Sequence, residues 1–176
     1  YGECHDNDGS HRTSGRIYRV EYGRAVPFTE NLATKTNVQL ALLHQHANEW
    51  QVRHARRILF ERSIGGADLS RVTTVLHMQL QRSRSTVQRL RCMWTLYLIG
   101  GLLEEDLVQQ LQDPDEHLRR WAVRLLVDLA EPGDKAIRAM ASMANEDPSP
   151  RVRLALASAL QKLQLAHRRE SRGGPT

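Results

Sequence analysis

The stretch DEHLRRWAVRLLVDL, residues 115–129, decides the fold. It places Leu118, Trp121 and Leu125 on one stripe of a helix, with arginines beside them. The stripe predicts an amphipathic helix that packs against a neighbour, because its apolar residues recur with the helical period. The arginines allow two interpretations: they form a binding face, or they tie one layer of a repeating scaffold to the next.

The same pattern recurs along the chain at a spacing typical of stacked helical repeats. Residues 113–126 align with residues 147–160 at an offset of 34. Residues 48–62 align with residues 115–129 at an offset of 67, about two periods, and residues 86–102 are the copy between them. The sequence therefore predicts a mostly α fold, an α-α superhelix of about four hairpins. The shorter first helices of these hairpins are predicted at about 38–46, 68–81, 104–112 and 134–145.

Two Asp-Pro pairs predict where the later helices begin. Asp113 precedes Pro114, and Asp147 precedes Pro148. An aspartate is a favoured N-cap, and a proline is tolerated in the first turn of a helix. We therefore expect Asp113 and Asp147 to cap the second helices of their hairpins, and Asn48 to do so in the first hairpin.

Composition indicates a globular protein and limits its partners. The chain has 176 residues, of which 40% are hydrophobic and 26% charged, and a net charge of +5. No apolar stretch approaches the roughly 18 to 20 residues that a membrane span needs. Cys4 and Cys92 lie in unlike contexts, so no disulfide framework is predicted. Because the chain begins with Tyr1, we expect it to be a piece of a longer protein.

The beginning and end of the chain differ from the helical part. Residues 1–25 contain RTSGRIYRVEYG, in which residues 16–22 read as one strand, and such a strand needs sheet partners upstream. Residues 26–37 are predicted as a linker, residues 38–166 as the helical repeats, and residues 167–176 as a disordered basic tail.

The repeated acidic, arginine, alanine and leucine pattern of residues 113–126 and 147–160 resembles the HEAT repeat. RTSGRIYRVEYG, followed by NEWQVRHARRILFER and RLRCMWTLYLIGGL, resembles the planctomycete-type putative membrane-bound dehydrogenase family. The resemblance implies that residues 15–23 are the terminal strand of a glucose dehydrogenase-like β-propeller, here truncated, and that HEAT-like repeats follow. It also implies an extracytoplasmic, periplasmic location.

The resemblance places cofactors in a longer parent protein. Haem c or pyrroloquinoline quinone is implied there, but this chain has no CxxCH motif for haem attachment. We therefore expect no catalytic or cofactor-binding residue in this segment, and no enzymatic activity of its own. One cluster carries metal-ligand chemistry, and a polar propeller loop explains it better than a metal site: Cys4, His5, Asp6, Asp8 and His11.

The arginines and the turn aspartates are the candidate contact residues. We expect most of them to form salt bridges between repeats, since arginine pairs four residues apart repel each other unless an anion lies between them. The second interpretation is that these arginines bind an acidic protein partner. Binding of nucleic acid is the third, because twenty carboxylates dilute the positive charge. The candidates are Arg53, Arg57, Arg119, Arg120, Arg124, Arg153, Asp113 and Asp147.

Three functions follow from this sequence. The first is a non-catalytic scaffold that contacts neighbouring domains of the same polypeptide or another protein. The second is a wall of a sugar or alcohol dehydrogenase active site. The third is a nucleic-acid-binding protein, which would need Trp50 and Trp121 exposed beside arginines, whereas their spacing predicts that they lie in the core. For stability, Leu126→Ala should cost far more than Arg119→Ala, unless the partner of Arg119 is buried.

Overall fold

The computed structural model describes residues 20, 22–23, 30–128 and 132–171, with side chains of the last segment up to Gln164. The chain forms two compact units, Tyr1–Glu30 and Asn31–Thr176. In the first unit, the four described residues lie in neither a helix nor a strand. The rest of the predicted strand, the cluster at residues 4–11 and the tail beyond residue 171 lie outside the described residues.

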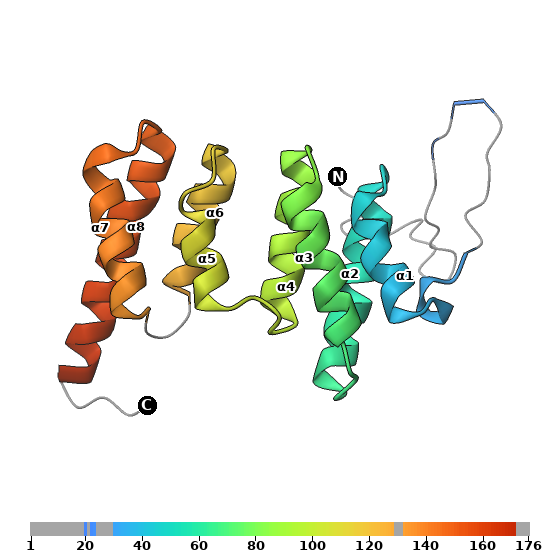
Figure 1. Cartoon of the computed structure of the whole chain (residues 1–176). Helices are drawn as coiled ribbons and strands as arrows, with labels where there is room; N and C mark the ends of the chain where they lie inside the picture. Colours follow the sequence, from blue (N-terminus) through green and yellow to red (C-terminus); the bar gives the residue numbers. More distant parts are fainter. Residues whose placement is uncertain (1–19, 21, 24–29, 129–131, 172–176) are drawn as a thin grey trace, which may run out of the picture. The chain divides into compact units, whose positions relative to one another are not determined.

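The described part of the second unit is helical, which confirms the predicted mostly α fold (Figure 1). Its α-helices form four successive hairpins, α1 with α2, α3 with α4, α5 with α6, and α7 with α8. Two short 3-10 helices, Leu32–Thr34 and Leu43–Gln45, lie before and after α1. The α-helices are α1 (Asn37–Leu42), α2 (Glu49–Ile64), α3 (Ser70–Arg82), α4 (Thr86–Leu98), α5 (Glu104–Gln110), α6 (Glu116–Leu126), α7 (Asp134–Glu146) and α8 (Pro150–Ser171).

The second helix of each hairpin begins after a residue whose side chain accepts a backbone N–H of the first turn. Asn48, Ser85 and Asp115 cap α2, α4 and α6 in this way, and Ser149 does so for α8. The predicted caps Asp113 and Asp147 are therefore wrong by two residues. Each of these aspartates instead accepts the N–H of the residue that caps the helix, at 2.9 and 2.8 Å. Both carboxylates are thus left at the turn between the helices.

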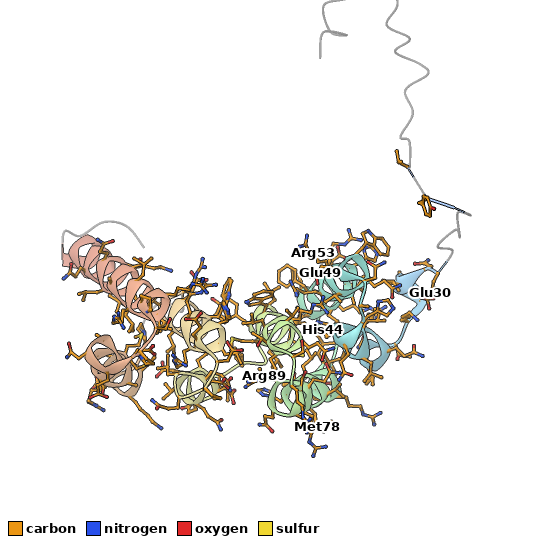
Figure 2. The ribbon with its side chains drawn as sticks, turned by 90° about the horizontal axis from the view of Figure 1, so that it is seen from above. Glu30, His44, Glu49, Arg53, Met78 and Arg89 are labelled. Carbon is orange, nitrogen blue, oxygen red and sulfur yellow. The ribbon has the colours of Figure 1, made fainter. Side chains whose placement is uncertain are left out.

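The hairpins stack through two rows of helices, which Figure 2 shows nearly end-on. In one row α2 contacts α4, α4 contacts α6, and α6 contacts α8. In the other row α1 contacts α3, and α5 contacts α7. A single hydrophobic cluster runs from Leu32 to Ala159 and includes Leu118, Leu126 and Val152. The last two hairpins therefore share one continuous apolar contact.

One leucine of α8 is exposed, although the equivalent leucine of α6 is buried. Leu160 is 58% exposed, whereas Leu126, which aligns with it at the offset of 34, is fully buried. Leu126 belongs to α6, and α8 packs against that helix. Leu160 lies on α8, in an apolar groove that it shares with Ile137 and Met140 of α7. The position is thus buried in the third hairpin and open in the fourth.

Part of the predicted linker belongs to the folded unit. Leu32 is buried in the core, and Arg62 of α2 fixes the segment around it. The guanidinium of Arg62 donates to the carbonyl oxygens of Ala33 and Lys35 at 2.8 and 3.0 Å, and to Asn37 Oδ1 at 2.6 Å. These bonds supply donors to carbonyl oxygens that receive no hydrogen bond from a helix backbone. The polar composition of residues 26–37 predicts neither the burial of Leu32 nor these hydrogen bonds.

Candidate interaction site

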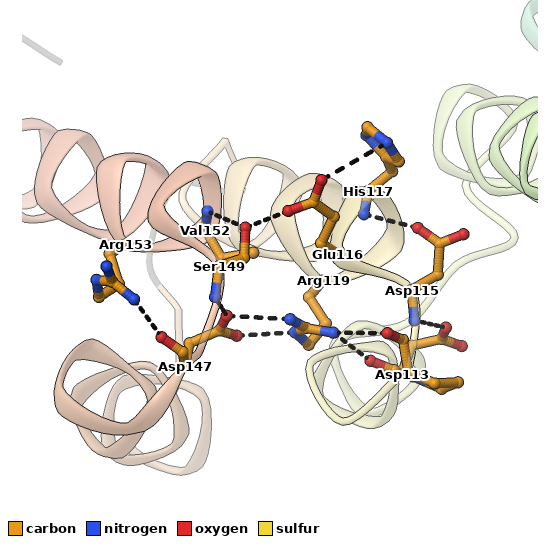
Figure 3. A network of polar contacts seen from close by, with 10 residues as sticks. Asp113, Asp115, Glu116, His117, Arg119, Asp147, Ser149, Val152 and Arg153 are labelled. Atoms are coloured by element: carbon orange, nitrogen blue, oxygen red, sulfur yellow. Dashed lines mark hydrogen bonds and ion pairs between the residues drawn. The ribbon is translucent and has the colours of Figure 1, made fainter.

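An arginine ladder joins neighbouring hairpins near the starts of α6 and α8 (Figure 3). Arg119 donates from Nε and Nη2 to the two carboxylate oxygens of Asp147, at 2.7 and 3.0 Å. Its Nη1 donates to the backbone oxygens of Asp113 and Pro114, at 2.8 and 3.0 Å. Arg89 makes the equivalent two-pronged pair with the Asp113 carboxylate. Each arginine therefore holds the aspartate in the turn of the following hairpin.

The arginine ladder is buried, so its charges stabilise the fold and are not available to a partner. The side chain of Arg119 is 11% exposed and that of Asp147 only 3%. The hydrogen bonds from Arg119 hold the pKa of Asp147 below its ordinary value, and the same bonds raise the pKa of Arg119. Arg153 also belongs to this region, because its Nη1 donates to the Asp147 backbone oxygen at 2.6 Å. These arginines are turned toward the fold and engaged there.

Arg53 and Arg57 lie on the exposed side of α2, and each has an acidic neighbour one turn away. Arg53 Nε lies 3.4 Å from a carboxylate oxygen of Glu49, and Arg57 Nη1 lies 3.7 Å from one of Glu61. Figure 2 shows Arg53 and Glu49 together at the outer edge of this helix. The like-charge repulsion predicted for this arginine pair is therefore offset within the helix itself.

Positive charge is concentrated on one row of helices. Counted up to Gln164, the last residue with a described side chain, α2, α4, α6 and α8 carry twelve arginines and lysines against three glutamates. The helices of the other row carry four basic residues against five acidic ones. The two rows of the stack thus differ in charge, and the row with the later helix of each hairpin is the basic one. An anionic partner would be attracted to that row.

Two arginines of α6, Arg120 and Arg124, line the groove between α6 and α8. Among the described residues, neither Arg120 nor Arg124 has a carboxylate within ion-pair distance. Arg124 lies over the ring of Trp121, with its guanidinium carbon 4.5 Å from the ring centroid. Arg120 Nε is buried and has no hydrogen-bond partner among the described residues. Both side chains line a groove of about 520 Å³, which we call the basic groove.

Two further cations line the basic groove, and the fold neutralises both. Arg151 Nη1 lies 2.9 Å from a Glu116 oxygen. Lys162 Nζ lies 2.7 Å from Asp128 Oδ1, and the other oxygen of Asp128 accepts the Tyr97 hydroxyl at 2.9 Å. The lysine hydrogen bond is the main reason that the pKa of Asp128 is lowered. The net positive charge of the groove therefore comes from its two arginines on α6. The lining residues are Arg120, Arg124, Val127, Asp128, Arg151, Leu154, Ala155, Ser158, Ala159 and Lys162.

Comparison with known proteins agrees with this architecture. Residues 104–170, which contain α5 to α8 as far as Glu170, match the family model of HEAT repeats. These residues are a HEAT-repeat segment. No curated protein and no solved structure matches the chain. The ladder pair of Arg119 with Asp147 and the whole basic groove lie within the HEAT-repeat segment.

The tryptophans lie partly outside the core, contrary to their predicted place. Trp50, ahead of the HEAT-repeat segment, is 54% exposed and stacks on His54 with 4.9 Å between ring centroids. Trp94 and Trp121 are half-buried against the core and meet edge to face at 5.0 Å. The core prediction is therefore wrong for Trp50 and only partly correct for the other two. Both Trp50 and Trp121 lie on basic helices.

A buried polar network between α1, α2 and α4 was not anticipated from the sequence. His44 is fully buried. Its Nε2 lies 2.7 Å from Thr95 Oγ1, which also accepts a hydrogen bond from Arg56 Nε at 3.1 Å. Arg91 joins Glu49 to the carbonyl oxygen of His46. The spacing of apolar residues within one helix does not predict such a network, because its polar members come from α2, α4 and the 3-10 helix Leu43–Gln45.

The described part of the chain has no metal-binding cluster and no membrane-spanning helix. No three histidine, cysteine or acidic side chains in it come together as a metal site. Across the same residues, no helix combines the length and the apolar character of a membrane span. Cys92 is a buried free thiol, whose pKa burial raises to about 12, and it donates to Gln79 Oε1 at 3.3 Å. That thiol is a core residue, as its apolar surroundings in the sequence predict.

Proposed function

We propose that these helical repeats are a scaffold that binds an acidic segment of a partner protein in the basic groove. HEAT repeats commonly mediate protein interactions, so the HEAT-repeat segment supports the general role. One observation supports the choice of surface. Arg120 and Arg124 face the groove without an acidic partner among the described residues, whereas Arg53, Arg57, Arg89 and Arg119 each have one. A carboxylate from outside would supply the missing counter-charge.

The stacked architecture suits binding. A single hairpin cannot bury its apolar face, so the repeats share one hydrophobic cluster and present rigid helix surfaces outward. The basic groove lies between two neighbouring helices of one row, which an extended peptide could follow. Its apolar lining residues, such as Leu154 at 69% exposure, would contact the stem of a bound side chain.

A nucleic-acid partner is the competing assignment. The exposure of Trp50 and the partial exposure of Trp121 beside arginines meet one condition that this assignment requires. A nucleic acid, however, needs several phosphates neutralised along one track. On α2, Arg53 and Arg57 are each paired with a glutamate of their own helix, and the basic groove supplies only two arginines without an ion pair. A short acidic protein segment matches this localised charge better.

An acidic peptide without phosphate tests the proposal. A fluorescein-labelled peptide of alternating glycine and glutamate should bind the full chain, with an affinity that falls as salt rises. The double variant Arg120→Gln with Arg124→Gln should lose most of this binding in fluorescence anisotropy. The matched double variant Arg53→Gln with Arg57→Gln removes the same charge from α2 and should keep it. Equal loss in both variants would show that only overall charge matters and would refute the assigned site.

We further propose, on the resemblance alone, that this segment belongs to a longer extracytoplasmic dehydrogenase-like protein. Haem c or pyrroloquinoline quinone would then be held by other domains of that protein, with these repeats docking neighbouring domains. The support is the likeness of residues 12–23, 48–62 and 89–102 to that family. Absorption spectra of the protein expressed from its longer reading frame test this. A reading frame without CxxCH or propeller blades, and without a cofactor spectrum, would exclude it.

A further inference from the structure

The two arginines of the basic groove stand one helical turn apart with like charge. Such a pair at i and i+4 is unfavourable unless an anion lies between the two guanidinium groups. Arg53 and Arg57 have the same spacing on α2, and there Glu49 and Glu61 supply the anions. At the same offset of 67, the equivalent carboxylates on and after α6 are Glu116 and Asp128, and Arg124 contributes to lowering the pKa of Asp128. Their hydrogen bonds go elsewhere, from Glu116 to Ser149 and Arg151 and from Asp128 to Lys162 and Tyr97, so neither forms an ion pair with Arg120 or Arg124. The contrast between two equally spaced pairs indicates that the pair on α6 meets its anion from outside.

The two guanidinium groups are already held in place. Arg124 rests on the Trp121 ring, which restricts its side chain to one side of the helix. The Nε atom of Arg120 is buried, although the fold provides no hydrogen-bond partner for it among the described residues. Binding an anion would therefore cost little side-chain entropy.

We propose that the basic groove recognises a phosphorylated side chain of a partner protein, with its phosphate between Arg120 and Arg124. A phosphate monoester carries about −1.5 to −2 charges and three acceptor oxygens near neutral pH. Two guanidinium groups match both the charge and the number of acceptors, whereas one carboxylate satisfies a single arginine. This inference rests on the proposed function, since it specifies the acidic group that the same groove receives.

The two carboxylates one turn from these arginines are already engaged by other residues. Asp128, which lines the groove, is held by Lys162 and by the Tyr97 hydroxyl, and Glu116 is held by Arg151 and by the Ser149 hydroxyl. The groove, at about 520 Å³, accommodates a phosphorylated side chain together with the adjoining peptide.

The test compares three peptides that differ at one central position. They share a glycine and glutamate backbone and carry phosphoserine, glutamate or serine at the centre. Fluorescence anisotropy with the full chain should show the phosphoserine peptide binding at least about ten-fold tighter than the other two. Arg120→Gln with Arg124→Gln should abolish that difference, while Arg53→Gln with Arg57→Gln should preserve it. Inorganic phosphate should displace the phosphoserine peptide from the groove at roughly millimolar concentrations.

Two further measurements keep the inference testable if a variant is poorly folded. Arg120→Lys with Arg124→Lys retains the charge but loses the two-pronged geometry, so it should reduce the preference for phosphoserine. Tryptophan fluorescence of the unmodified protein should change on binding the phosphoserine peptide, because Trp121 lies beneath Arg124. An unchanged signal would count against the site.

The outcomes separate this inference from the proposed function. If all three peptides bind equally well and the α6 variant loses them, the acidic-segment scaffold stands and phosphate recognition is refuted. If none binds, both fail. A single-stranded oligonucleotide of equal charge, bound more tightly than the phosphoserine peptide, would overturn both in favour of a nucleic-acid partner.

Discussion

His44 is a titratable side chain placed where the fold excludes its charged form. Burial is the main reason that its pKa falls to about 4, and the nearby guanidinium of Arg56 adds to the effect. The ring has hydrogen-bond partners at both nitrogens, the Ala41 carbonyl at 3.0 Å and the Thr95 hydroxyl at 2.7 Å. The neutral ring is therefore well accommodated, while a proton on it would meet a cation in a water-poor site.

The lowered pKa of His44 predicts how stability depends on pH. Since the folded pKa of about 4 lies below the ordinary value of 6.5, the unfolded chain binds the proton more readily. The free energy of unfolding should therefore be highest above pH 6.5 and fall by about 3 kcal/mol as the pH drops from 6.5 to 4. Urea melts across this range, at constant ionic strength, measure the fall.

A glutamine at this position provides the control. His44→Gln keeps a hydrogen-bonding side chain but cannot titrate, so its unfolding free energy should stay nearly level between pH 6.5 and 4. The lowered pKa values of Asp115, Asp128 and Asp147 add their own loss of stability only at more acidic pH, below about 4. An unchanged slope in the glutamine variant would refute the role given to His44.

Individual helices are joined by the arginine ladder, and the burial of that ladder changes its expected contribution. The sequence predicts a small cost for Arg119→Ala unless its partner is buried, and Asp147 is buried. Removal of Arg119 leaves a buried carboxylate without its counter-charge, so Arg119→Ala should destabilise the protein by about 3 kcal/mol. Arg53→Ala, which breaks an exposed pair within α2, should cost about 0.3 to 0.5 kcal/mol. Denaturant melts that rank the two variants equally would contradict this account.

The sequence predicts the helices better than it predicts the roles of their arginines. The helical period and the offset of 34 located all four hairpins, because both depend on apolar residues along one helix. Arg119 and Arg120 are neighbours in sequence, yet one joins two hairpins and the other lines the basic groove. Successive residues point about 100° apart around a helix, so their roles depend on how α6 is rotated against its neighbours. That rotation comes from packing between helices, which the sequence pattern does not give.

Across the helical unit, the apolar contacts that hold the hairpins together and the exposed positive charge lie in different places. The apolar cluster extends from the first hairpin to the last, while the basic groove occupies one side of the last two. Stability of such a stack is approximately a sum of terms from each repeat and from each interface between repeats. A leucine that lies in an interface should therefore affect stability far more than the equivalent leucine outside one.

Leu126 and Leu160 test this division because they occupy equivalent positions in successive repeats. Leu126→Ala removes a fully buried side chain where α8 packs on α6 and should cost about 2 to 5 kcal/mol. Leu160→Ala removes one that is 58% exposed and should change stability by less than about 0.5 kcal/mol. Both changes are from leucine to alanine on a helix, so helix propensity affects them alike. Urea melts of the two variants measure the difference, and a cost at Leu160 as large as that at Leu126 would mean that the fourth hairpin is covered by a contact outside the described fold.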